Sequence, residues 1–179
     1  MHIPETHASR QEARLKYLPN PIKAILVAEA PPEAEDRFFY YPDVKEYDWL
    51  FWGMMEVLYN QKRQPLAEVK LRLLERFQDD GYYLMDTSET PLPSELKNKK
   101  RVRALKPAVP GLIIRLKEVG ALERSIPIIL IKATVYEAAY KILEQEGFNV
   151  VNTNKIAFPS SGQQENFRRE FDKIIQQLR

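Results

Sequence analysis

The stretch VAEAPPEAEDRFFYYP, residues 27–42, places a carboxylate directly after a strongly apolar run. That carboxylate, Glu29, stands between two small alanines. Two prolines follow, which restrict φ and stiffen the chain. A carboxylate held in this way is suited to positioning water or to stabilising a positive charge that develops in a reaction. Glu33 and Glu35 are the alternative acids in the same segment.

Four consecutive aromatic residues, Phe38 to Tyr41, follow these acids. A single ring in such a position usually belongs to the core. Four rings beside a carboxylate indicate that at least one is a stacking surface for a flat ligand such as a nucleobase. Phe38 and Phe39 are the candidates.

Two further segments combine polar residues with the end or start of an expected element. GYYLMD is an apolar run that ends in Asp86, and the turn residues TSETP follow. In FPSSGQQ, residues 158–164, Ser160 or Ser161 is placed to cap a C-terminal helix. The same small residues also leave backbone N–H groups available to a phosphate. The sequence leaves turn or cap and ligand contact open for both segments.

Composition limits the chemistry. The chain has 179 residues, no cysteine, and histidine only at His2 and His7. This excludes disulfides, thiolate nucleophiles and Cys-ligated clusters, and it argues against a His-built metal site or a catalytic triad. We therefore expect no metal. Residues 96–117 contain eight basic residues and no acid. Such a run is a solvated face or a phosphate-contacting segment, with Lys99, Lys100 and Arg101 at its centre.

Short apolar runs alternate with amphipathic segments, which predicts an α/β fold with a mostly parallel sheet. The expected strands are residues 23–28, 81–86 and 127–132, with a fourth near 148–151 or 155–158. The carboxyl ends of parallel strands share one edge, where ligands bind. One domain, 1–179, is expected, with a partly helical N-terminal extension over residues 1–20. The N-terminus is polar and no apolar run approaches the roughly 20 residues of a membrane span, so we expect a cytoplasmic protein without membrane contact.

The order of these motifs resembles the uracil-DNA glycosylase superfamily. AEAPP after the first strand, RFFYYP, a strand that ends in Asp86, and FPSSG before the last helix follow one another from about Lys23 to the C-terminus. The resemblance implies a three-layer α/β/α sandwich with a central four-stranded parallel sheet. It implies a protein that binds DNA, flips a damaged base such as uracil and hydrolyses its N-glycosidic bond without a cofactor. We also expect a monomer.

The resemblance also implies residue roles. Glu29 is the catalytic residue, and Ala30, Phe38, Phe39 and Asp86 contact the base. The last motif, Pro159, Ser160, Ser161 and Gly162, holds the DNA strand. From its charge alone, the basic run is expected to add phosphate contacts, with Lys99, Lys100 and Arg101.

The chain departs from the superfamily at three positions, where Ala28, Asp86 and Phe158 replace Gly, Asn and His. An ionised Asp86 accepts hydrogen bonds but does not donate one to a base carbonyl. The alternative interpretation is therefore a catalytically inactive nucleic-acid or nucleotide-binding protein on the same fold. The third interpretation is an unrelated α/β domain in which these motifs occur by chance.

Overall fold

The computed structural model describes residues 5–44 and 47–179, and within them the side chains of all but residues 5–8 and 98. A parallel sheet of three strands forms its centre: β1 Ala24–Ala28, β2 Tyr82–Asp86 and β3 Ile128–Leu130. The strand order is β2-β1-β3. The predicted α/β class with a parallel sheet is confirmed.

The central position of β1 follows from its sequence. All five residues of AILVA are buried, as expected for a strand with neighbours on both edges and helices over both faces. Its register with β2 places Ala28 opposite Asp86. Pairing continues past the strand ends, because Thr87 and Ser88 donate backbone hydrogen bonds to the carbonyls of Ala28 and Glu29 at 2.8 and 2.9 Å. Glu29 and Asp86 therefore emerge on the same edge of the sheet.

The expected fourth strand is reduced to an isolated bridge between Ile128 and Val150. Beyond it, the side chain of Asn152 takes the place of a main-chain partner. Its Oδ1 accepts from the Leu130 N–H at 2.8 Å, and its Nδ2 donates to the Leu130 carbonyl at 3.2 Å. The buried amide satisfies the edge of β3, so no fourth strand is needed there.

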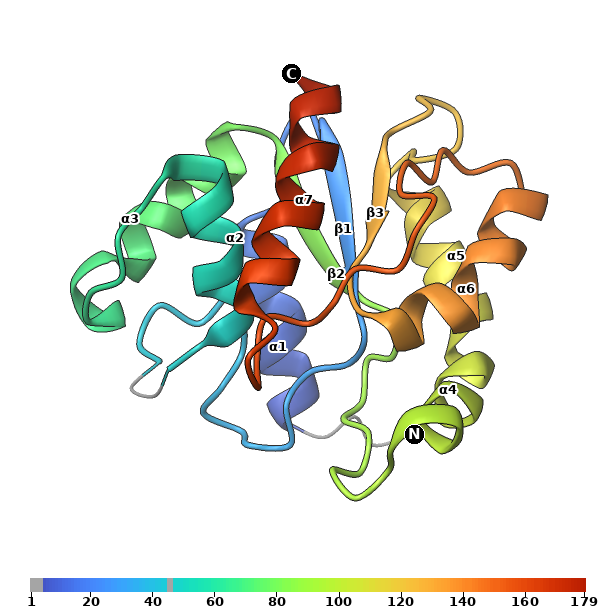
Figure 1. Cartoon of the computed structure of the whole chain (residues 1–179), viewed down its shortest axis with the longest axis horizontal. Coiled ribbons are helices and arrows are strands. Elements are labelled where there is room, and N and C mark those ends of the chain that lie inside the picture. Colours follow the sequence, from blue (N-terminus) through green and yellow to red (C-terminus); the bar gives the residue numbers. More distant parts are fainter. Residues whose placement is uncertain (1–4, 45–46) are drawn as a thin grey trace.

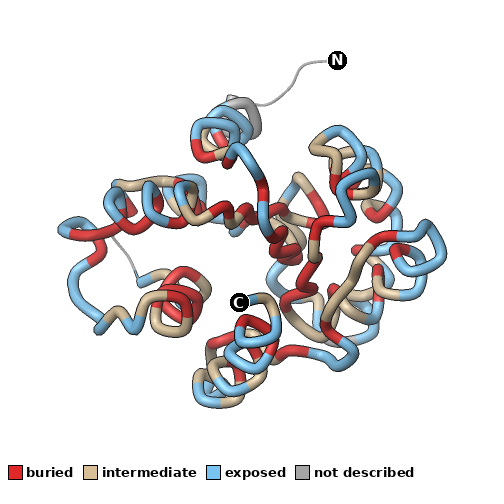
Figure 2. The backbone as a smooth tube through the Cα atoms, turned by 90° about the horizontal axis from the view of Figure 1, so that it is seen from above, coloured by how far each residue is buried: buried red, intermediate tan, exposed pale blue. Residues whose placement is uncertain are grey.

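Helices lie on both faces of the sheet. Figures 1 and 2 show the N-terminal helix α1 and the C-terminal helix α7 on opposite faces. Helix α2 packs on α7, and α4 packs on α6. The bounds are α1 Glu5–Lys16, α2 Trp49–Tyr59, α3 Leu66–Asp79, α4 Asn98–Leu105, α5 Val109–Glu118, α6 Ala133–Gln145 and α7 Gln164–Leu178, with a 3-10 turn at Lys106–Ala108. Within the described ranges, no helix has the length and apolar character needed to cross a bilayer.

The expected serine cap of α7 is wrong. The helix begins at Gln164 behind Gln163, and no side chain caps it. Ser161 and Gly162 have φ of 52° and 80°, and this left-handed pair turns the chain so that the Gln163 N–H bonds the Ser160 carbonyl at 3.0 Å. The turn leaves both serines outside the helix, where they do not reach its first N–H groups.

Candidate functional site

A cavity of about 380 Å³ lies at the carboxyl edge of the sheet. Its volume falls within the range of small-ligand pockets. The walls come from the segment after β1, the start of α2, the ends of β2 and β3, helix α4 and the segment before α7. The residues that line it include Glu29, Ala30, Phe38, Phe39, Tyr47, Trp49, Asp86, Arg101, Lys132 and Phe158.

Glu29 is the most heavily contacted group of this cavity. Glu29 is only 7% exposed. Oε2 accepts from Arg101 Nε at 2.7 Å and from Lys132 Nζ at 2.6 Å, while Oε1 accepts from Thr134 Oγ1 at 2.5 Å. Three side chains, one from α4 and two from the start of α6, thus hold one carboxylate that extends from the end of β1.

These contacts fix the charge of Glu29. Burial on its own would raise the pKa of the carboxyl, but hydrogen bonds from Lys132, Thr134 and Arg101 outweigh it and the pKa is lowered overall. Glu29 is therefore ionised at neutral pH. Among the described residues, Thr134 alone donates to Oε1, so this oxygen keeps room to accept a hydrogen bond from a water or a ligand.

Lys132 sits in a backbone conformation that suits glycine. Its φ is 84° and its ψ is 139°, directly before the first residue of α6. Such a conformation costs a residue with a Cβ about 1–3 kcal/mol. Its ammonium reaches Glu29 and also lies 5.6 Å from the centre of the Phe158 ring. Strain of this kind is concentrated at functional sites, which makes Lys132 a site candidate.

This strain gives a prediction. Lys132→Gly and Lys132→Ala both remove the ammonium, but only glycine relaxes the backbone. We expect the glycine variant to unfold with a free energy about 1 kcal/mol higher than that of the alanine variant, against the usual order in which glycine is the less stable. Denaturant unfolding of the two variants measures it. A glycine variant equal to or less stable than the alanine variant would show that the backbone is not strained.

Asp86 faces the same cavity from the end of β2 and is partly exposed. Among the described residues, no hydrogen bond reaches its carboxyl oxygens; Arg115 donates to its backbone carbonyl at 2.7 Å. Burial raises the pKa of Asp86 to about 7, although the charges of Arg14, Arg115 and Arg10 oppose the rise. Near neutral pH this group is present both as a carboxylate and as a neutral acid, so it offers a ligand acceptors alone or a donor and an acceptor.

The aromatic run serves the core as well as the cavity. Tyr40 is fully buried, and its hydroxyl accepts from the Leu84 N–H at 2.7 Å. Phe38 and Phe39 are each 6% exposed and pack against other rings, yet both line the cavity. Lys70 is buried beneath them and donates to the Phe38 carbonyl and to Asp48 Oδ2, both at 3.2 Å. These contacts fix the position of the two rings in the cavity wall.

The last motif divides between cavity and surface. Phe158 lines the cavity. Pro159 is buried against α2, where a Cβ added to Gly53 would lie 3.0 Å from the proline ring. Ser160, Ser161 and Gly162 are not part of the cavity wall. Ser160 is half-buried, and the two residues after it are exposed. The structure therefore brings Glu29, Phe39 and Asp86 together but leaves Ser160 outside.

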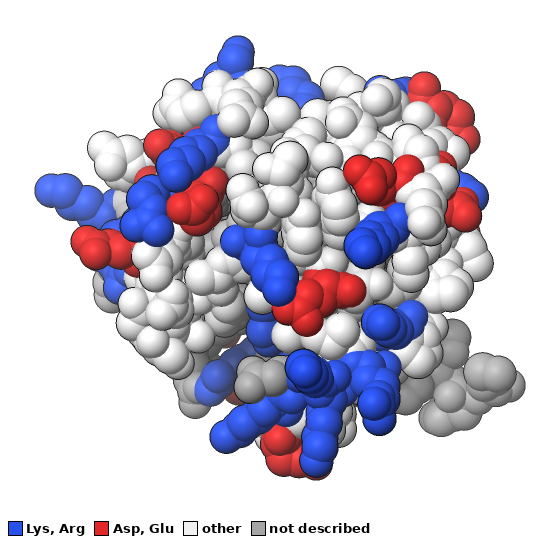
Figure 3. Space-filling model, turned by 45° about the vertical axis from the view of Figure 1, so that its right-hand side comes forward, with Lys and Arg blue, Asp and Glu red and all other residues white. Residues whose placement is uncertain are grey.

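The basic run also divides. Arg101 turns inward, where it bonds Glu29 as well as the carbonyls of Pro93 and Leu96 at 3.1 and 3.3 Å. Lys99 and Lys100 point outward and are exposed. Arg101, expected on the surface as a phosphate contact, is thus part of the cavity wall. Figure 3 shows Lys and Arg side chains gathered on the exposed side of this region.

Sequence reasoning missed Lys132 and Thr134. The signal was present, since PIILIK is an apolar run that ends in a lysine at the same sheet edge as Glu29 and Asp86. No group of three or more His, Asp or Glu side chains is arranged to hold a metal ion within the described part of the chain.

Comparison of the chain with protein-family models, with curated proteins and with solved structures finds no match.

Proposed function

We propose that the cavity receives a single base of a nucleic acid and that the protein is a DNA glycosylase-like protein of the uracil-DNA glycosylase type. The observation that supports it is the position of Glu29, Asp86 and the Phe38–Phe39 wall around one cavity. Aromatic side chains in the wall, a group that presents acceptors or a donor, and a fixed carboxylate are what base recognition beside a sugar requires.

In this proposal the reaction is hydrolysis of the N-glycosidic bond. Water adds to the sugar carbon as the bond to the base breaks, and the base leaves with the bonding electron pair. The water's proton passes to solvent or to the base. Glu29, through the open position on Oε1, orients the water and faces the positive sugar. Lys132 stabilises the anionic base, a role for which the superfamily pattern offers a His that Phe158 replaces.

The proposed fold is the three-layer α/β/α sandwich of that superfamily, built here on three strands. The basic side chains of α4 supply part of the DNA contact, and the molecule acts as a monomer. Ala30 and the segment 159–162 are assigned to the base and to the DNA strand on the resemblance alone.

One observation favours a second function. Two cations already neutralise Glu29, so much of its electrostatic effect on a positive sugar is offset. In this second function the protein is a catalytically inactive nucleic-acid or nucleotide-binding protein, whose cavity binds a base without cleaving its bond to the sugar.

A base panel separates the two functions. Single strands and duplexes that contain uracil, hypoxanthine, xanthine or a mismatch are incubated with the protein and then treated with alkali, which cleaves the strand wherever a base was lost. The first proposal predicts cleavage at one of these bases. Binding to the panel without any cleavage supports the second function, and neither binding nor cleavage contradicts both.

A further inference from the structure

Two large aromatic side chains at the mouth of the cavity are exposed. Tyr47 and Trp49 are 40% and 38% exposed, and both belong to the cavity wall. Their ring centres are 4.3 Å apart with the planes tilted by 60°. The guanidinium of Arg63 lies 5.8 and 5.7 Å from the two ring centres. Arg63 is itself paired with Glu56, so it holds the two rings in place rather than adding a free charge. Exposed rings at a pocket entrance form a stacking surface for a base.

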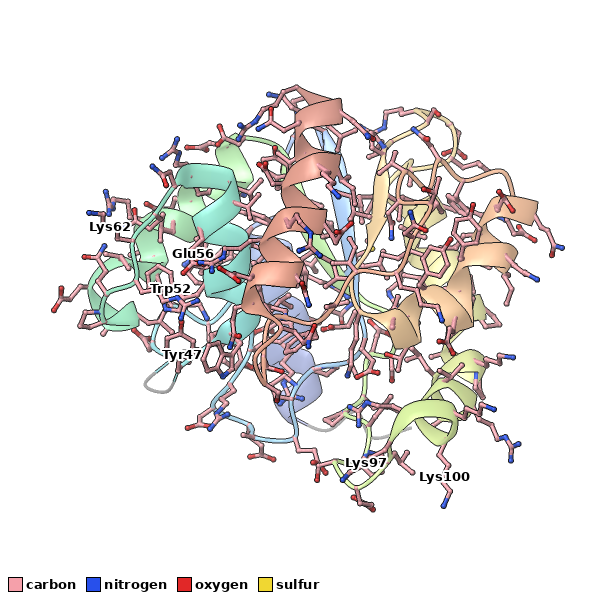
Figure 4. All side chains as sticks on the ribbon, in the orientation of Figure 1. Tyr47, Trp52, Glu56, Lys62, Lys97 and Lys100 are labelled. Carbon is pink, nitrogen blue, oxygen red and sulfur yellow. The ribbon has the colours of Figure 1, made fainter. Side chains whose placement is uncertain are left out.

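On the other side of the cavity stands the basic surface of α4, which we define as Lys97, Lys99, Lys100 and Arg103. All four are exposed, and none forms an ion pair within the described residues. The neighbouring Arg101 joins this helix to the cavity through Glu29. Figure 4 shows Tyr47 on one side and Lys97 and Lys100 on the other, all toward the end of the molecule where the strands finish. Cations without partners are available to an anion.

We propose that a single-stranded nucleic acid crosses the mouth of the cavity, with its phosphates on the basic surface of α4 and a base stacked on Tyr47 or Trp49. The inference rests on the proposed function, because the nucleotide between these two contacts is the one whose base enters the cavity. Glu33 lines the cavity, and Glu35 and Asp36 are exposed in the same segment. Their negative charges repel phosphates, which favours a path of the backbone on the α4 side.

The two exposed rings explain why we expect a single strand rather than a duplex. An aromatic side chain binds the face of a base, and in a duplex those faces are covered by neighbouring base pairs. Phosphate contacts on α4 are available to either form of DNA. The preference for single strands therefore depends on Tyr47 and Trp49, whereas the salt dependence comes from the lysines.

The fluorescence of Trp49 provides the test. The chain has two tryptophans, and Trp52 is buried at 1% exposure. In the Trp52→Phe variant, emission comes from Trp49 alone. We expect a short oligothymidylate to quench this emission on binding, and the matched duplex to bind more weakly. In wild-type protein, anisotropy of a labelled strand gives the affinity independently of that variant.

Two sets of variants locate the contacts. Trp49→Ala is expected to weaken single-strand binding about tenfold, and Trp49→Phe to restore most of it, because stacking needs only a ring. Ile114→Ala, at an exposed apolar residue of α5, is the control and should have no effect. Replacing Lys97, Lys99 and Lys100 by Ala should reduce the slope of log K against log salt by about 2. Replacing Lys117, Lys155 and Lys173, which are each paired to an acid elsewhere, changes the net charge equally and should leave the slope unchanged.

The outcomes separate this inference from the proposed function. The inference is overturned if duplex and single strand bind with equal affinity and Trp49 emission does not change. It is also overturned if both lysine variants reduce the slope of log K against log salt equally. Either result holds even if a base still enters the cavity. Quenching of Trp49 by single strands, with equal affinity for every base of the panel and cleavage of none, supports the inference and contradicts the base pocket.

Discussion

Glu29→Gln is expected to lower the free energy of unfolding by about 3 kcal/mol. The substitution keeps the shape but leaves Arg101 and Lys132, with side chains 18% and 29% exposed, beside a neutral amide. Breaking a buried ion pair from one side is strongly destabilising, because the remaining charge stays desolvated without its partner. Urea unfolding of wild type and variant measures the loss.

A second substitution identifies the cause. Lys132→Met in the Glu29→Gln background removes one stranded cation, so the double variant should lose at least about 1 kcal/mol less than the sum of the single losses. Glu146→Gln breaks an exposed pair with Lys117 and should change stability by no more than about 0.5 kcal/mol. Strict additivity of the two cavity substitutions would mean that Glu29 and Lys132 do not stabilise each other.

The same variant bears on catalysis. If the protein cleaves a base from the panel, Glu29→Gln should reduce turnover by on the order of 100-fold, the scale of one well-placed electrostatic group. Binding of the substrate strand should stay level, because the phosphate contacts are elsewhere. Unchanged turnover would place the catalytic carboxylate at Glu33 or Glu35 instead.

Asp86→Asn is expected to change how stability depends on pH. The folded pKa of Asp86, about 7, lies above that of an unfolded aspartate, so the folded state binds the extra proton. The contribution of Asp86 to stability is then largest at acidic pH and falls as pH rises from about 4 to 7, by on the order of 4 kcal/mol. Asparagine does not titrate and removes this fall.

Denaturant unfolding of both proteins across that pH range tests the direction of this pH dependence. The difference between the Asn variant and wild type should move in favour of the variant as pH rises and level off above pH 7. Glu29, whose pKa is lowered, contributes the opposite trend at more acidic pH in both proteins and so cancels from the difference. If the free energies of unfolding of wild type and variant change with pH in parallel, Asp86 does not titrate in this range.

The parallel sheet, and the edge of it at which the cavity lies, were predictable because they depend on local pattern. Five consecutive apolar residues specify β1 as a strand buried on both faces. Parallel pairing then places the residues that follow β1 and β2 side by side, so the proximity of Glu29 and Asp86 follows from sequence alone.

The rest depends on contacts between distant parts of the chain. The fourth strand is lost because the single amide of Asn152 satisfies Leu130. Arg101 turns inward because Glu29, 72 residues earlier, accepts from it. In the sequence, Arg101 is indistinguishable from the lysines beside it. The serine cap failed because Ser161 adopts a positive φ, which a pattern of Ser before Gln does not reveal.

Fluorescence of a single 2-aminopurine in a short oligonucleotide tests the central claim, that the cavity takes up one base. This analogue is quenched while it is stacked between its neighbours and changes its emission when it is turned out. We predict a change on binding to wild type that is lost in Ala30→Phe, where a ring fills part of the cavity, while the affinity for the strand falls only slightly. An unchanged emission on binding, or the same change in both proteins, would contradict the account.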